Sequence, residues 1–186
     1  PPPLFFYTHP TPHPILSGLV GSEMCIRDSI NSVLSAMGPK YKLIYPSYDE
    51  MHDASVKLAR KLKKKKLPLK KLVIVSRGGL LAGSIIGYEL GIQDCDIVAA
   101  SSYIGRSVSK IKVYRGPKIK EPVVVIDDIV DRGGTARALK KLMPKMHLAV
   151  LYVKPRGQKL AGSYVKRVSQ NTWPVFPWDT EDQKNH

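Results

Sequence analysis

Residues 123–135 have the sequence VVVIDDIVDRGGT, and this stretch decides the fold. Its first four residues are apolar and β-branched, which is typical of a buried parallel strand. Two adjacent carboxylates follow, and paired glycines then lead into a helix that begins near Thr135. Glycines let backbone N–H groups approach an anion closely, and a helix start adds a positive dipole end. We therefore predict a strand–loop–helix unit that binds a phosphate.

The carboxylates Asp127 and Asp128 indicate that this phosphate belongs to a sugar. They would repel a bare phosphate, whereas ribose hydroxyls need acceptors and Mg²⁺ needs hard oxygen ligands. The stretch lacks the Gly-Lys-Ser or Gly-Lys-Thr ending of a Walker motif, and Gly133-Gly134 lacks the preceding glycine of the dinucleotide fingerprint. An incidental pair of acids is disfavoured, because carboxylates next to a buried strand are costly without a partner.

Strands and helices alternate on both sides of this stretch. Ser47 and Glu50 form a capping-box pattern before a helix whose apolar residues recur at helical spacing. Further strands are predicted at 72–75, 96–103 and 147–153, and a helix at 80–90. The polar, basic residues 104–120 are predicted to form a long mobile loop. The pattern predicts a doubly wound α/β domain with a mostly parallel sheet of about five strands flanked by helices, with ligands beyond the carboxyl ends of the strands.

The first part of the chain differs from the rest. It is rich in proline, and residues 20–28 resemble a translated sequencing-adapter artefact. We expect residues 1–36 to be a non-native or disordered extension, with Met37 as a plausible start, and residues 37–186 to form the functional domain. The two cysteines, Cys25 and Cys95, lie far apart, which favours a reducing, cytoplasmic setting.

The 186 residues carry a formal charge of +15, much of it in lysine runs such as 63–66. A basic surface favours polyanionic partners. Specific nucleic-acid binding is not predicted, because no aromatic or arginine residues are interleaved with these lysines. No apolar stretch is long enough to predict a membrane span.

The order and spacing of several motifs resemble the bacterial xanthine-guanine phosphoribosyltransferases, a family of type I purine phosphoribosyltransferases. The resemblance covers residues 48–179. It rests on residues 76–79 (SRGG), 89–92 (ELGI), 101–103 (SSY), 127–135, 154–155 (KP), 172–173 (TW) and 177–179 (PWD). It implies the type I fold, with a small C-terminal or hood region.

The resemblance also implies roles for the phosphate and ribose side. Arg77 and Gly78 would bind pyrophosphate, next to a peptide bond that is often cis in the family. Asp127 and Asp128 would hold the ribose hydroxyls, with Asp128 and Asp179 at the Mg²⁺ position. The loop that binds phosphoribosyl pyrophosphate would comprise Asp127, Asp128, Ile129, Val130, Asp131, Arg132, Gly133, Gly134 and Thr135.

On the base side, Asp131 would face N7 of the purine and act as the general acid/base. Lys154 would donate to the 6-oxo group, Trp173 would stack on the base, and Pro174 would contact the exocyclic 2-position through its carbonyl group. Two positions depart from the family: Arg132 replaces a small hydroxyl residue, and Ser109 replaces an arginine, with Arg106, Lys110 or Lys112 as substitutes.

The expected function is purine salvage, in which phosphoribosyl pyrophosphate and a 6-oxopurine give a nucleoside 5′-monophosphate and pyrophosphate; the candidate bases are guanine, xanthine and hypoxanthine. The expected cofactor is Mg²⁺, and the resemblance implies a homo-oligomer, a dimer or tetramer. The alternative is a nucleic-acid-binding regulator on the same fold that senses phosphoribosyl pyrophosphate. The retained Asp131 favours the enzyme over the regulator.

Overall fold

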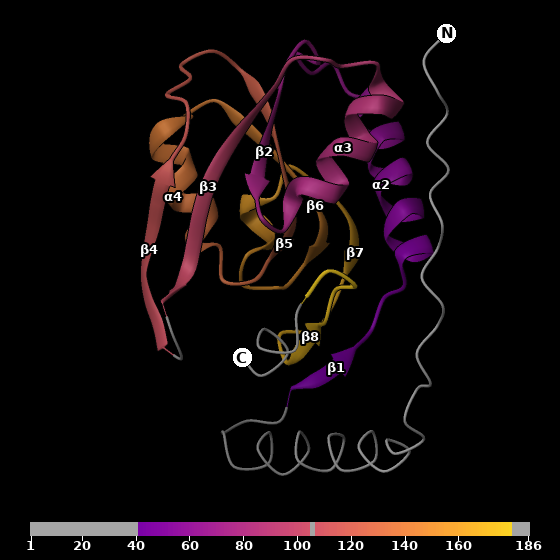
Figure 1. Cartoon of the computed structure of the whole chain (residues 1–186), viewed down its shortest axis with the longest axis vertical. Coiled ribbons are helices and arrows are strands. Elements are labelled where there is room, and N and C mark those ends of the chain that lie inside the picture. Colours follow the sequence, from indigo (N-terminus) through magenta and orange to yellow (C-terminus); the bar gives the residue numbers. More distant parts are fainter. Residues whose placement is uncertain (1–40, 105–106, 180–186) are drawn as a thin grey trace, which may run out of the picture. The chain divides into compact units, whose positions relative to one another are not determined.

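A six-stranded, mostly parallel sheet carries the helices of this protein (Figure 1). The computed structural model describes residues 41–104 and 107–179. The strand order is β4-β3-β2-β5-β6-β7, in which β4 alone runs antiparallel to its neighbour. The strands are β2 (Leu72–Ser76), β3 (Cys95–Ile104), β4 (Ser107–Arg115), β5 (Val123–Val130), β6 (Met146–Val153) and β7 (Ser163–Arg167).

Helices cover both faces of this sheet. They are α2 (Tyr48–Lys63), α3 (Gly79–Leu90) and α4 (Gly134–Leu142), with a short 3₁₀ turn, η1 (Gln158–Leu160). The predicted capping box is confirmed at the start of α2, where the Ser47 hydroxyl accepts from Glu50 N at 3.1 Å and Ser47 N donates to the Glu50 carboxylate at 2.8 Å. Gly91 ends α3 with φ +66°, a conformation that favours glycine.

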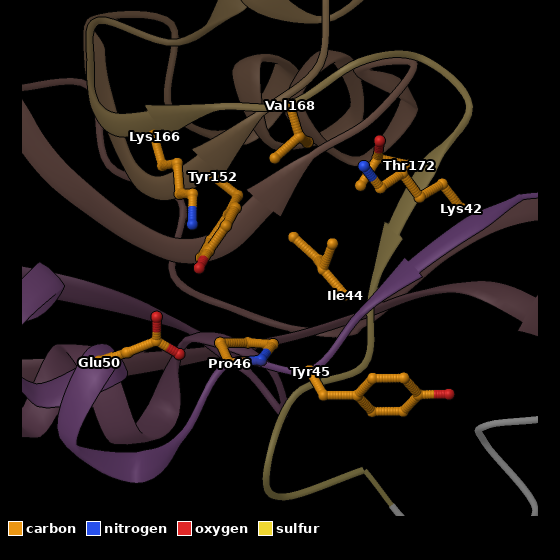
Figure 2. Close-up of a pocket in the computed structure, with 9 residues that line it drawn as sticks. All are labelled: Lys42, Ile44, Tyr45, Pro46, Glu50, Tyr152, Lys166, Val168 and Thr172. Carbon is orange, nitrogen blue, oxygen red and sulfur yellow. The ribbon is translucent and has the colours of Figure 1, made fainter.

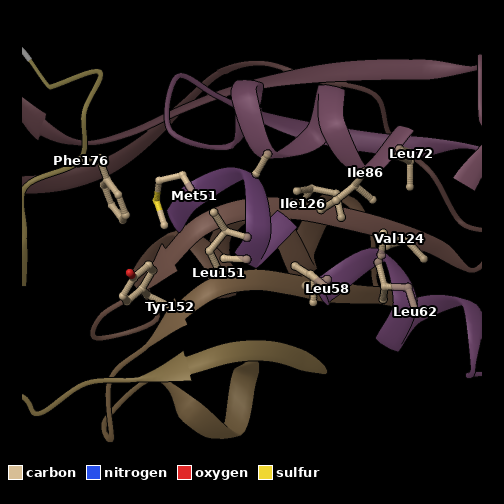
Figure 3. Packing of buried hydrophobic residues seen from close by; sticks show 14 of the residues in the cluster. Met51, Leu58, Leu62, Leu72, Ile86, Val124, Ile126, Leu151, Tyr152 and Phe176 are labelled. Atoms are coloured by element: carbon tan, nitrogen blue, oxygen red, sulfur yellow. The ribbon is translucent and has the colours of Figure 1, made fainter. Parts of the chain in front are cut away.

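Two hydrophobic clusters occupy the two faces of the sheet, and β5 contributes to both. Val124 and Ile126 face the cluster beneath α2 and α3, whereas Val123 and Val125 face the cluster beneath α4. Figure 3 shows the first cluster, in which Leu58 of α2 packs near these strands. Burial on both faces explains why the strand is a continuous apolar run.

The predicted mostly parallel α/β fold is confirmed, but the prediction of a loop over residues 104–120 is wrong. Residues 107–115 form β4, which pairs antiparallel with β3 and makes the sheet six-stranded. The lysines and serines in this segment mask its strand pattern, although Val108, Ile111 and Val113 are β-branched. Lysine is common on edge strands because it discourages pairing with other chains.

The strand that precedes the glycine-rich loop is longer than predicted. The sequence predicts that it ends at Ile126, but β5 continues to Val130. Ile129 and Val130 extend its parallel pairing with Tyr152 and Val153 of β6. The turn to α4 is therefore confined to residues 131–133, and Asp127 and Asp128 belong to the strand.

The predicted C-terminal or hood region contains a second, two-stranded sheet. In it β1 (Lys42–Ile44) pairs in parallel with β8 (Thr172–Pro174).

The prediction of an extension over residues 1–36 lies outside the described residues. Among residues 41–104 and 107–179, no helix has both the length and the apolar character needed to cross a membrane.

Candidate active site

The carboxyl ends of three neighbouring parallel strands bring the predicted site residues to one edge of the sheet. β2 ends directly before Arg77, β5 carries the carboxylates near its end, and β6 ends directly before Lys154. The Ser76–Arg77 peptide bond is cis, as the resemblance implies. In doubly wound folds this edge is where ligands bind.

Gly78 lies directly against the carboxylate of Asp128. A Cβ atom at position 78 would overlap that carboxylate, so the close approach requires glycine. At Gly79 a Cβ would come within 2.6 Å of the Ile126 carbonyl oxygen instead. The predicted pyrophosphate loop and the predicted ribose carboxylates therefore meet at van der Waals distance.

Asp127 and Asp128 form a pair of adjacent carboxylates, of which Asp127 is buried and Asp128 is partly buried. Asp128 N donates to Asp127 Oδ1 at 3.0 Å, and Ile129 N donates to Asp128 Oδ1 at 2.6 Å. Burial raises the pKa of Asp127 well above its usual value, and the charge of Asp128 acts in the same direction. Burial also raises the pKa of Asp128 to about 6. Such a pair is suited to hydroxyl groups or to a cation.

Asp179 lies close enough to Asp128 for its charge to raise the pKa of that residue further. One of its oxygens accepts from Phe176 N at 2.8 Å, which holds the turn after β8. No cluster of three or more acidic, histidine or cysteine side chains able to hold a metal is found in the described part of the chain. Two carboxylates nevertheless fit Mg²⁺, which usually takes one or two protein carboxylates together with substrate phosphates and water.

The turn between β5 and α4 leaves backbone donors open. Gly133 has φ +75° and precedes α4 without a side-chain cap, and α3 likewise begins after Gly78 without one. The Arg137 side chain donates to the Arg132 carbonyl oxygen at 2.9 Å, and this hydrogen bond stabilises the turn. Two uncapped helix starts at one sheet edge suit two phosphate groups.

Lys154 is fully buried, and its ammonium group has no hydrogen-bond acceptor among the described residues. Its Nζ atom lies 3.4 Å from Asp131 Oδ1 and 4.5 Å from the centre of the Trp173 ring. Burial lowers the pKa of Lys154, and the carboxylate of Asp131 opposes that shift. An orphaned donor of this kind is costly unless a ligand oxygen satisfies it.

The structure brings Trp173, the residue predicted to stack on the base, next to this lysine and adds a neighbour that the sequence did not indicate. The Tyr41 ring meets Trp173 edge-on, with 6.1 Å between ring centres, and lies 5.4 Å from Lys154 Nζ. Pro174 is buried in β8, where it pairs with Ile44 of β1. The sequence does not indicate Tyr41, because this residue reaches the site through the pairing of β1 with β8.

Gln170 is a second neighbour that the sequence did not indicate. Its side-chain nitrogen donates to Asp131 Oδ1 at 2.6 Å.

The loop positions within residues 104–120 that depart from the family have no described side chains. The side chains of Ser109, Arg106, Lys110 and Lys112 lie outside the described part of the chain.

A cavity of about 260 Å³ lies against β1 and β8 and is lined by none of the predicted site residues (Figure 2). Thr172 of β8 faces it, whereas the next residue, Trp173, contacts Lys154. The cavity is lined by Lys42, Ile44, Tyr45, Pro46, Glu50, Tyr152, Lys166, Val168 and Thr172. None of these residues has a predicted role, so the cavity does not enter the proposed reaction.

Replacing Gly78 with alanine is expected to disable the site without unfolding the protein. The new methyl group would displace the Asp128 carboxylate, which is the flexible end of a side chain and can move away. Turnover should fall by about 10- to 100-fold, since displacements of about 1 Å have effects of this size.

Gly87→Ala is the matched control in the same helix, because a Cβ there meets its nearest neighbour at 3.4 Å, an ordinary contact. Steady-state kinetics and thermal melting of both variants test this prediction. Full activity of Gly78→Ala would contradict the assigned contact with Asp128.

Asp127→Asn is expected to stabilise the fold while reducing activity. Because the folded-state pKa of Asp127 is raised, this residue stabilises the fold below its unfolded pKa, and that stability is lost as the pH rises through the folded pKa. Asparagine has no proton to lose from its side chain at high pH, so it avoids this loss of stability. Its amide oxygen can still accept the hydrogen bond from Asp128 N. At pH 8, without metal or substrate, Tm should rise by roughly 2–4 °C, the shift typical of 1 kcal/mol in a chain of this size.

The stabilisation should shrink as the pH is lowered from 8 to 5, because the raised pKa favours uptake of a proton by native Asp127. Melting curves of both proteins at the two pH values make the comparison. An equal or lower Tm for Asp127→Asn at pH 8 would show that the Asp127 carboxylate is not strained by burial.

Comparison with known proteins gives a consistent result. The family model of the phosphoribosyl transferase domain matches residues 47–185. A xanthine-guanine phosphoribosyltransferase of Desulfotalea psychrophila is 40% identical over 152 residues, which cover 79% of this chain and 93% of the relative. A protein of the same name from Gluconobacter oxydans is 36% identical over 143 residues, covering 72% of this chain and 83% of the relative.

Solved structures agree on the fold. A purine phosphoribosyltransferase from Pyrococcus horikoshii has a TM-score of 0.63 and 27% identity, and the match covers 75% of this chain and 95% of that one. The xanthine-guanine-hypoxanthine phosphoribosyltransferase of Helicobacter pylori has a TM-score of 0.61 at 23% identity, over 74% of this chain and 93% of that one. At that identity, the second likeness concerns the fold alone.

Proposed function

This chain belongs to the phosphoribosyl transferase domain family, and we propose that it transfers the phosphoribosyl group of phosphoribosyl pyrophosphate to N9 of a 6-oxopurine. The products are a nucleoside 5′-monophosphate and pyrophosphate, and the candidate bases are guanine, xanthine and hypoxanthine. The observation that carries the proposal is the buried ammonium group of Lys154. Among the described residues it has no hydrogen-bond acceptor, and it lies 4.5 Å from the centre of the Trp173 ring and 3.4 Å from Asp131 Oδ1.

The phosphate groups are bound from two helix starts. Backbone N–H groups of residues 131–135, ahead of α4, hold the 5′-phosphate. Arg77 and the backbone at Gly78, ahead of α3, hold the pyrophosphate leaving group. Arg132 is exposed at the turn and adds positive charge beside the 5′-phosphate.

Asp127 and Asp128 accept hydrogen bonds from the ribose hydroxyls. Asp128 and Asp179 are the residues that would hold Mg²⁺ together with the substrate. Bound Mg²⁺ would neutralise pyrophosphate and improve it as a leaving group. The negative charge of the aspartate pair also suits the oxocarbenium character expected at C1′ of the ribose.

The base lies on Trp173 with its 6-oxo group toward Lys154 Nζ. Asp131 receives the proton that the purine loses, while N9 forms its bond to C1′ and the bond from C1′ to pyrophosphate breaks. The electron pair of the broken bond leaves with pyrophosphate. No covalent intermediate with the protein is needed.

Selectivity follows from the donor at the 6-position. An ammonium group can donate to a 6-oxo oxygen but cannot accept from the 6-amino group of adenine. Leaving such a buried donor unpaired costs about 1–3 kcal/mol or more for a charged group. At the 2-position Pro174 offers a carbonyl acceptor and no N–H, which suits the 2-amino group of guanine.

The relatives are named as transferases, so they do not favour the alternative of a nucleic-acid-binding regulator. A cytoplasmic location and assembly into a dimer or tetramer remain part of the proposal. The location follows from the cysteine content, and the oligomer from the resemblance.

The test is nucleotide formation from guanine, xanthine or hypoxanthine with phosphoribosyl pyrophosphate, measured with and without Mg²⁺. We expect nucleotide and pyrophosphate in equal amounts, and a large loss of rate when a chelator is added. Failure to form nucleotide from any of the three bases would overturn the proposed function.

A further inference from the structure

Gln170 contacts the proposed acid/base residue from a distant part of the chain. It lies 39 positions after Asp131, in the turn between β7 and β8. Its Nε2 atom donates to Asp131 Oδ1 at 2.6 Å, which is a short hydrogen bond to a carboxylate. Neither the proposed reaction nor the motifs of the sequence require this contact.

A second hydrogen bond fixes which way the Gln170 amide points. The backbone N–H of Arg156 donates to Gln170 Oε1 at 3.2 Å. Since a backbone N–H can only donate, the amide oxygen must face Arg156 and the amide nitrogen must face Asp131. These two hydrogen bonds together identify the atom of Gln170 that donates to Asp131 as the amide nitrogen.

Two nitrogen atoms lie close to the same oxygen of Asp131, one as a hydrogen-bond donor and the other as the cation of an ion pair. Besides Gln170 Nε2, the Nζ atom of Lys154 lies 3.4 Å from Oδ1. In the described part of the chain no hydrogen bond to the other carboxylate oxygen, Oδ2, is found, so Oδ2 is available to the base. We propose that Gln170 is a positioning residue that locks the Asp131 carboxylate with Oδ2 turned toward the purine. This inference rests on the proposed function.

The turn that carries Gln170 is closed by its own hydrogen bonds and leads directly into β8, which carries the proposed base-stacking residue Trp173. Thr172 N donates to the Ser169 carbonyl oxygen at 3.1 Å, and the hydroxyl groups of Ser169 and Thr172 lie 2.7 Å apart. Trp173 follows immediately. One short turn thus sets both the acid/base residue and the ring on which the base stacks, which is the kind of support that precise catalytic geometry requires.

The variant Gln170→Glu isolates the donor. It has the same shape and keeps the acceptor for Arg156 N, but it replaces the donor to Asp131 with a second carboxylate. We expect kcat with guanine to fall on the order of 100-fold, since a hydrogen bond to a charged group is lost and a like charge is added. The KM for phosphoribosyl pyrophosphate should not change, because the phosphate-binding backbone is untouched.

Gln170→Met removes the donor without adding charge, and kcat should fall on the order of 10-fold. Gln93→Glu is the control for the chemical change, since Gln93 is exposed in the turn after α3, and it should keep full kcat. Thermal melting of each variant accompanies the kinetics.

The outcomes separate the two claims. Absence of turnover in the unaltered protein overturns the proposed function and the positioning role with it. Normal turnover in the unaltered protein with unchanged kcat in Gln170→Glu overturns the positioning role alone. It is also overturned if both Gln170 variants lose their melting transition, or if KM for phosphoribosyl pyrophosphate changes as much as kcat, because either result indicates a general structural role.

Discussion

Replacing Asp131 with asparagine is expected to lower kcat with guanine by about 10²- to 10⁴-fold, the usual contribution of a positioned general acid/base. Asparagine can still accept the hydrogen bond from Gln170, but it cannot take the proton of the purine. Steady-state kinetics at saturating substrate measure the loss. Asp53→Asn, an exposed change on α2, should leave kcat unaltered.

The same variant should also lose stability. Asp131 is the countercharge of the fully buried Lys154, and removing one partner of a buried ion pair leaves an uncompensated charge. We expect Tm to fall by several degrees. Adding Lys154→Met to Asp131→Asn should restore Tm but not kcat. Wild-type turnover in Asp131→Asn would remove the acid/base role, whatever the change in Tm.

Lys154→Met alone is expected to change activity and stability in opposite directions. Methionine fills a similar unbranched volume against the rings of Trp173 and Tyr41 without a buried charge. Tm should therefore stay constant or rise. The kcat/KM for guanine should fall by about 10- to 100-fold, because the donor to the 6-oxo group is gone.

Lys159→Met, on the exposed side of η1, is the matched control and should change neither quantity. The assignment of Lys154 would be contradicted if the variant kept its kcat/KM for guanine. It would also be weakened by a large loss of Tm, since that would show that the ammonium group is stabilised by the fold rather than held for a ligand.

The parts of the fold that the sequence predicted are those with a local cause. The capping box at Ser47 depends on residues three positions apart, and the buried strands β2 and β5 are apolar runs because both of their faces are covered. The edge strand β4 was missed because, among the described strands, it has a neighbour on one side alone, and lysines interrupt its apolar residues.

The site residues likewise fall into those that the sequence predicted and those that it did not. The structure brings Arg77, Asp128 and Lys154 to one edge of the sheet, which follows from a parallel topology. Tyr41 and Gln170 could not be predicted. Tyr41 is placed by the pairing of β1 with the distant strand β8, and Gln170 by a turn between β7 and β8 that reaches Asp131. Short segments of this kind carry no periodic pattern, and only their long-range pairing places their side chains.

The central claim is that a buried lysine donor selects a 6-oxopurine, and guanine with 2,6-diaminopurine tests it most directly. The two bases differ at the 6-position, where guanine has an oxygen and 2,6-diaminopurine an amino group. With phosphoribosyl pyrophosphate and Mg²⁺, kcat/KM should favour guanine by at least about 100-fold, since a site built to hydrogen-bond one group strongly rejects an analogue that leaves its donor unpaired. Equal kcat/KM values for the two bases would contradict the account.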